Sequence, residues 1–205
     1  MSKNKSSIAT MVLSLGAITA IAAALLAWVN NVTKTPIEEA RNAKKVTAIQ
    51  DVTPAFTNDP IADADSIIPE GEDRTVVVFP AFEDGILTGA AVETYSMDGF
   101  SGEITLMVGF DAAGSITGYT VLSHAETPGL GAKMNEWFRD NEGKRSVIGS
   151  NPAVRNMNVA KDPGGEVDGI TAATITSRAF LQAIRRAHSA FNQYCETKSH
   201  NNNEQ

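Results

Sequence analysis

The sequence predicts an α+β fold with one N-terminal transmembrane helix, followed by a single domain in which helices pack on an antiparallel sheet. Three observations predict this fold. The chain begins with a long uncharged apolar stretch, its middle alternates short β-rich runs with Gly and Asp turns, and its end carries an amphipathic helix pattern. The fold class therefore follows from hydrophobic periodicity and turn residues.

Length and composition restrict the classes of function. The chain has 205 residues, of which 42% are hydrophobic, enough for one ordinary domain beyond the apolar start. Its 17 Lys and Arg against 24 Asp and Glu give a net charge of −7, which disfavours a nucleic-acid partner because such a surface repels phosphate backbones. The single cysteine, Cys195, excludes an intrachain disulfide, a CxxC pair and a four-cysteine metal centre. Any redox chemistry therefore requires a non-metal cofactor.

Residues 8–29 are predicted to form a transmembrane helix. These 22 residues carry no charge, and at about 1.5 Å per residue they reach about 33 Å, enough to cross a bilayer core. A cleaved signal peptide is the alternative, but the run exceeds a typical signal core and no Ala-x-Ala site ends it. Lys3 and Lys5 weakly favour a cytoplasmic segment 1–7. We therefore expect a single-pass protein of the bacterial inner membrane with residues 30–205 on the periplasmic side.

Residues 30–74 are predicted to form a stalk helix and an acidic loop. Thr35-Pro36-Ile37-Glu38 is typical of a helix start, with Thr as the N-cap and Pro in the first turn, so a helix over about 36–52 is expected. Residues 54–73 contain three prolines and six acidic residues, which is loop composition. The Asp63-Ala64-Asp65 sequence resembles the opening of an EF-hand loop, but the required glycine and terminal glutamate are missing. A solvated acidic loop is the better interpretation.

Residues 75–197 are predicted to form the folded domain, and residues 198–205 a polar tail. The β-rich runs, separated by turns such as Asp111-Ala112-Ala113-Gly114, lie at 75–79, 87–95, 103–110 and 116–122. A short helix is expected around 132–141 and a longer one around 176–197. Apolar residues at helical spacing in the longer helix predict that it docks on the sheet; they are Phe180, Ile184, Ala187, Phe191 and Tyr194.

Common catalytic and metal motifs are absent from the sequence. His124, His188 and His200 are scattered, and neither HExxH, GxSxG nor a Walker sequence occurs. The Gly129-Leu130-Gly131 sequence lacks the third glycine of a dinucleotide fingerprint. No catalytic residue and no metal ligand are therefore predicted.

One segment, residues 168–177, combines features that suit a phosphate. It places four hydroxyl side chains and two alanines immediately before the final helix. Small side chains and exposed amides at a helix N-terminus favour an anion, because the helix dipole and the unpaired N–H groups point at it. The alternative is an N-cap rich in Ser and Thr, which many helices have.

The same segment resembles the flavinylation motif Asp-x-(Ser/Thr)-Gly-Ala-(Ser/Thr)-x-Thr. This motif marks the FMN-binding domain shared by the G subunit of the Rnf complex and the C subunit of the sodium-pumping NADH:quinone reductase. The matching residues are Thr171, Ala173, Thr174 and Thr176, with Ser177 following and Asp168 one position further upstream than the Asp of the motif, and Ala172 stands where the family usually has Gly. The resemblance implies that FMN is attached covalently to Thr174 through a phosphoester bond.

Three further stretches follow the same family's order, so that the resemblance covers roughly residues 95–185. They are Gly99-Phe100-Ser101-Gly102, Val108-Gly109-Phe110-Asp111 and the loop 124–131. In that family the Glu-Thr-Pro-Gly-Leu-Gly loop lies against the flavin, which adds Glu126, Thr127, Gly129, Leu130 and Gly131 to the implied cofactor site. Glu126 is either a proton partner or a turn-capping carboxylate. Lys133 and Lys161 either offset phosphate charge or are solvated surface residues.

The resemblance implies an electron-transfer subunit of a membrane-bound, ion-translocating ferredoxin:NAD oxidoreductase, a redox subunit without an independent active site. Its implied partners are the other membrane subunits of the Rnf complex and a flavin transferase for maturation. Two alternatives stay open at this point. One is the C subunit of a sodium-pumping quinone reductase, and the other is an anchored extracytoplasmic flavin-binding module that senses or scaffolds.

Overall fold

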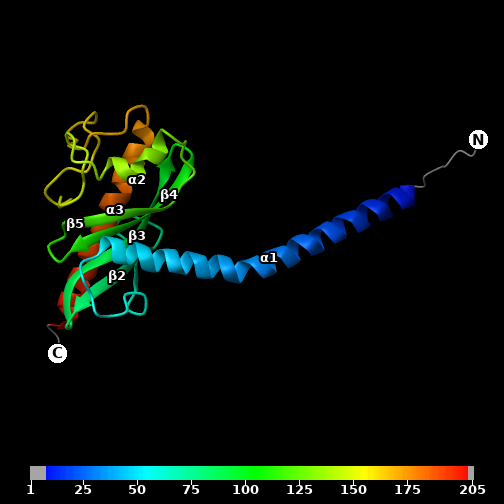
Figure 1. The fold of residues 1–205 in the computed structure, drawn as a ribbon, viewed down its shortest axis with the longest axis horizontal. Helices are drawn as coiled ribbons and strands as arrows, with labels where there is room; N and C mark the ends of the chain where they lie inside the picture. Colours follow the sequence, from blue (N-terminus) through cyan, green and yellow to red (C-terminus); the bar gives the residue numbers. More distant parts are fainter. Residues whose placement is uncertain (1–7, 203–205) are drawn as a thin grey trace, which may run out of the picture. The chain divides into compact units, whose positions relative to one another are not determined.

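The computed structural model describes residues 8–202 and divides the chain into two units. The first unit comprises residues 1–44 and the second residues 45–205. The predicted cytoplasmic segment 1–7 lies outside the described residues. Figure 1 shows the helix α1 of the first unit and the sheet with its helices in the second.

The described part of the first unit, residues 8–44, is helical. Helix α1 runs from Ile8 to Val52, so that its end belongs to the second unit, and it contains Pro36 in its interior. Within it, Thr10–Pro36 is 27 residues long and apolar enough to cross a membrane, with a mean hydropathy of 2.3. The predicted helix start at Thr35 is wrong, because α1 continues through this position. The missing N–H of one interior proline removes a single hydrogen bond from the ladder and does not end the helix here.

The second unit is built on an antiparallel sheet whose strands follow one another in chain order. The strands are β1 (Asp65–Ile67), β2 (Val76–Glu83), β3 (Ile86–Gly99), β4 (Gly102–Asp111) and β5 (Ile116–Ser123). The four predicted strands are confirmed, with longer ends. The short edge strand β1 lies in the segment predicted to be an acidic loop. The β2–β3 turn uses Asp84 and Gly85, both with positive φ, which matches the twist of a two-residue hairpin.

Helix α3 (Thr174–Asn202) covers one face of the sheet (Figure 1). Val76 and Val78 of β2 point into this core, as strand alternation requires, and the ring of Phe180 stacks on Phe138 at 4.3 Å between centroids. The predicted helix around 132–141 is shorter, a 3₁₀ turn η1 (Gly131–Lys133) followed by α2 (Met134–Trp137). Helix α3 extends beyond residue 197, so part of the predicted polar tail is helical.

The last turns of α1 cover the opposite face of the sheet. Ala48, Ile49 and Val52 pack on Phe79, Ala91 and Met107, whose side chains alternate with those facing α3. Gly109 and Gly118 are cross-strand partners, and a Cβ at Gly109 would lie 1.8 Å from the Val52 carbonyl oxygen. The Thr117 hydroxyl donates a hydrogen bond to that oxygen. The compact unit therefore begins at Lys45 and not at the expected boundary of residue 75.

Candidate functional site

A tight turn at residues 170–173 delivers the chain into α3. The Ala173 N–H donates to the Ile170 carbonyl oxygen at 3.0 Å, and Ala172 has a φ of +61°. A turn residue with positive φ is normally Gly, because a Cβ is strained there. The motif that this segment resembles has Gly at this position, which the positive φ of Ala172 favours.

The N-terminus of α3 has no side-chain cap. The Ser177 N–H donates to the Ala173 carbonyl oxygen at 3.0 Å, so Ala173 takes the N-cap position and Thr174 is the first helical residue. Alanine offers no side-chain acceptor. Within residues 8–202 the N–H groups of Thr174, Ile175 and Thr176 have no acceptor, and the first turn contains no acidic residue. This end of the helix is therefore available to an anion.

The hydroxyl groups of the segment fall into two sets. Those of Thr176 and Ser177 are buried and engaged: Ser177 Oγ donates to the Ala173 carbonyl oxygen at 2.9 Å and accepts the Ile170 N–H at 2.8 Å. Thr174 is half-buried, and its hydroxyl has no hydrogen-bond partner in the described part of the chain; Thr171 is exposed on the preceding turn. Thr174 is thus the helical hydroxyl of the segment that the fold leaves uncommitted.

The loop that precedes η1 is a tight turn. The Leu130 N–H donates to the Thr127 carbonyl oxygen at 3.1 Å, with Pro128 in the second position and Gly129, at φ +76°, in the third. This is the residue pattern of a type II turn. Leu130 remains 42% exposed at its tip, and Thr127 is exposed as well.

Glu126 joins this loop to α3 and to the β3–β4 turn. Its Oε2 accepts the Thr176 hydroxyl at 2.6 Å, its Oε1 accepts the Ser101 N–H at 2.9 Å, and the residue is 4% exposed. A Cβ at Gly131 would lie 2.5 Å from Glu126 Oε2, so Gly131 is required by this contact. The Glu126 carboxylate therefore links the loop to the β3–β4 turn and to α3 through two hydrogen bonds. The missing side chain at Gly131 leaves room for the Glu126–Thr176 pair.

Asp168 supports the loops behind the segment. Its Oδ2 accepts the Lys144 N–H at 2.9 Å, and its carbonyl oxygen accepts the Trp137 indole N–H at 2.8 Å. A Cβ at Gly143 would approach Asp168 Oδ2 to 2.8 Å. These contacts hold Asp168, which precedes the 170–173 turn, against α2 and the segment that follows it. Lys133 and Lys161 are both exposed.

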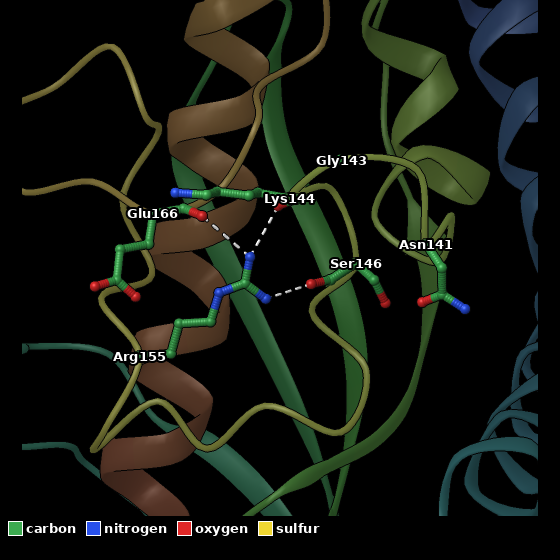
Figure 2. A pocket seen from close by; sticks show the side chains of 6 residues that line it. All are labelled: Asn141, Gly143, Lys144, Ser146, Arg155 and Glu166. Atoms are coloured by element: carbon green, nitrogen blue, oxygen red, sulfur yellow. Dashed lines mark hydrogen bonds between the residues drawn. The ribbon is translucent and has the colours of Figure 1, made fainter.

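Two hollows lie near these elements. One, of about 400 Å³, is polar and contains Arg155, which donates to the carbonyl oxygens of Lys144, Glu166 and Ser146 (Figure 2). Because main-chain carbonyls and Ser150 Oγ occupy its donors, Arg155 organises the loops. The second hollow, of about 320 Å³, lies beside the start of α3 and includes Ile175 and Arg178.

Several of these contacts could not be predicted from the residue pattern. Ser101 and Lys144 carry no local signal for their contacts, since each pairs with a residue distant in sequence, Ser101 with Glu126 and Lys144 with Asp168. Only Ser101 stands inside a stretch that the family resemblance marks. The structure brings together Thr176, Glu126 and Gly131 as a contacting group, whereas Asp168 makes its contacts on the side of Lys144 and Trp137.

Comparisons with known proteins identify the family to which the chain is similar. The family model of the FMN-binding domain matches residues 99–189. The chain is 31% identical over 190 residues to the G subunit of the ion-translocating oxidoreductase complex of Vibrio cholerae serotype O1 (strain M66-2), covering 89% of each chain. It is 37% identical over 173 residues to the corresponding G subunit of Escherichia coli (strain K12), covering 80% of this chain and 81% of that one.

A shorter match, to the G subunit of Vibrio vulnificus (strain YJ016), is 37% identical over 130 residues, 62% of this chain and 60% of the relative. The matched FMN-binding domain contains the β3–β4 turn, the Glu126–Gly131 loop and the start of α3. The chain therefore belongs to the family of G subunits of ion-translocating oxidoreductase complexes and carries its FMN-binding domain.

Proposed function

We propose that this chain carries electrons within an ion-translocating oxidoreductase complex through an FMN that is joined to Thr174 by a phosphoester bond. The observation that carries the proposal is the uncapped N-terminus of α3, where Thr174 has a free hydroxyl beside three N–H groups without acceptors in the described chain. Bound FMN supplies the redox chemistry, and the protein holds and orients it.

The residues at the start of α3 and in the Glu126–Gly131 loop fit the phosphate and the ring of FMN, respectively. The phosphate suits the N–H groups of the first turn of α3, and the ring suits the exposed tip of the Glu126–Gly131 loop at Leu130. Attachment replaces the Thr174 O–H bond by an O–P bond. The hydroxyl proton leaves, and a flavin transferase supplies the FMN phosphoryl group from a phosphoanhydride donor whose other half departs.

The proposed membrane arrangement rests on the length and apolar composition of α1. We propose that Thr10–Pro36 spans the bacterial inner membrane once and that the domain from Lys45 onward lies on the periplasmic side, beside the other membrane subunits. A covalent bond keeps the cofactor with the domain in a compartment from which free FMN would be lost. Protease added to spheroplasts should then remove the domain, and a protected domain would contradict this orientation.

Both alternative functions use the same cofactor site. The similarity to G subunits, over 80–89% of the chain, favours this proposal over the C subunit of a quinone reductase and over a sensor or scaffold module.

Expression of the full chain with a flavin transferase tests the linkage. The protein should gain the mass of FMN less one water and fluoresce on a denaturing gel. Thr174→Ala should abolish both signals, whereas Thr171→Ala, the same change on the exposed turn, should retain them at a reduced or full level. Covalent flavin in the Thr174→Ala protein would overturn the assignment.

A further inference from the structure

Arg178 lies one helical turn after Thr174 on α3. Residues at i and i+4 share a helix face, with about 5–6 Å between their Cβ atoms. Helical side chains lean toward the N-terminus of their helix, so the guanidinium of Arg178 extends back toward the level of Thr174. Arg178 is therefore the first basic side chain that α3 offers on the face of Thr174.

The Asp162 carboxylate orients the Arg178 guanidinium. Arg178 Nε donates to Asp162 Oδ2 at 2.9 Å and Nη2 donates to Asp162 Oδ1 at 2.7 Å, a bidentate pair. This pairing raises the pKa of Arg178 and lowers that of Asp162. Arg178 Nη1 has no hydrogen-bond partner among the described residues, so a second anion can still be accepted by the same planar group.

A phosphate on Thr174 would add negative charge beside a hollow whose acidic and basic side chains balance. Asp98 and Asp162 line the hollow beside Ile175, together with two arginines. One of these, Arg185, donates Nη1 to the carbonyl oxygen of Met157 and to Asn158 Oδ1, and it follows Thr174 by 11 residues, about 16 Å along the helix axis. Arg178 follows Thr174 by four residues, about 6 Å along the axis, so it is the arginine of this hollow that can reach a phosphate on Thr174, through Nη1.

We infer that Arg178, held in place by Asp162, pairs with the phosphate of the Thr174-linked FMN. This inference rests on the proposed function and adds a residue to it. Arg178 neutralises the phosphodiester and separates it from the Asp162 carboxylate. A role confined to fixing the loop around Asp162 to α3 is the competing explanation, and it predicts no effect on the phosphate itself.

Phosphorus-31 NMR of the flavinylated full chain in detergent separates the two explanations. Arg178→Gln should shift the phosphodiester resonance, because the charged hydrogen-bond donor is removed. Lys198→Gln is the matched control: it removes the same charge from an exposed position near the other end of α3 and should leave the resonance unchanged. Asp162→Asn, which keeps the guanidinium, should shift the resonance less than Arg178→Gln does.

The outcomes are distinguishable from failure of the proposed function. If the wild-type chain acquires no covalent flavin, the proposed function fails. If flavin is attached but the resonance is the same in the wild-type and Arg178→Gln proteins, or moves equally in Lys198→Gln, only the pairing is overturned. Should Arg178→Gln fail to fold, Arg178→Lys serves instead, because it keeps the charge, loses the planar fork and should still shift the resonance.

Discussion

The Thr176 hydroxyl donates a 2.6 Å hydrogen bond to Glu126 Oε2 and joins two segments that are 50 positions apart in the chain. Both residues are buried, at 1% and 4% exposure, and Gly131 packs against the pair so closely that a Cβ there would collide with it. The start of α3 and the Glu126–Gly131 loop are therefore one structural unit. The Thr176–Glu126 hydrogen bond therefore fixes the position of the loop relative to a group bound at the start of α3.

Thr176→Val should lower the free energy of unfolding by about 1–3 kcal/mol, because the buried Glu126 carboxylate loses one of its two donors. Thr176→Ser keeps the hydroxyl and should cost less. Urea denaturation of the full chain, followed by tryptophan fluorescence, measures the difference. Equal stability of the Val and Ser variants would show that the hydrogen bond does not support the fold.

Ala172→Gly should stabilise the protein by up to about 1 kcal/mol, since release of the positive-φ strain of Ala172 exceeds the added flexibility of the unfolded chain. The control is Ala113→Gly, an exposed turn alanine without positive φ, which should destabilise. Thermal unfolding of both variants checks the sign. A lower melting temperature for Ala172→Gly would mean that this turn is not strained.

Leu130→Ala tests the contact between the Glu126–Gly131 loop and the flavin. It removes an exposed side chain without touching the Glu126–Thr176 pair, so the fold and the linkage should survive while the flavin absorbance and potential shift. Gly131→Val is less suited, because the collision at Glu126 disturbs the fold first. Ile86→Ala is the control, because Ile86 is also exposed but lies at the end of β3 away from the β3–β4 turn. An unchanged spectrum and potential in Leu130→Ala would reject the contact.

His188 should make the stability of the domain sensitive to acid. Burial against Phe110 lowers its pKa below the ordinary 6.5, so below that pH the unfolded chain binds more protons than the folded one. Its contribution to the free energy of unfolding is then fully present above about pH 6.5 and declines as the pH falls through the folded pKa. Denaturation curves at pH 7.5 to 5 should show this decline, and His188→Gln should flatten it.

Much of the fold is readable from the sequence. The four longer strands follow from alternation and turn residues, and α3 from its apolar spacing. The edge strand β1 is only three residues long and lies in acidic composition, so its local signal is that of a loop. The predicted helix start at Thr35 is wrong because the local sequence does not distinguish a proline in the first turn of a helix from one in its interior.

The candidate site is predictable as two segments but not as a contact. Thr174 and the Glu126–Gly131 loop stand out through their residue types and the family resemblance. Nothing in the local pattern pairs Glu126 with Thr176, because a hydrogen bond across 50 positions depends on how the sheet and α3 pack. The support that Asp168 gives to Lys144 and the position of Arg178 beside Asp162 arise in the same way.

The most direct test of the account is the location of the flavin in the protein. Trypsin cleaves after Lys161 and Arg178, so residues 162–178 form one peptide that contains Thr171, Thr174, Thr176 and Ser177. Tandem mass spectrometry of this peptide from the mature full chain should place the FMN mass on Thr174 alone. A peptide without added mass, or fragments that place the flavin on Thr171, Thr176 or Ser177, would contradict the account.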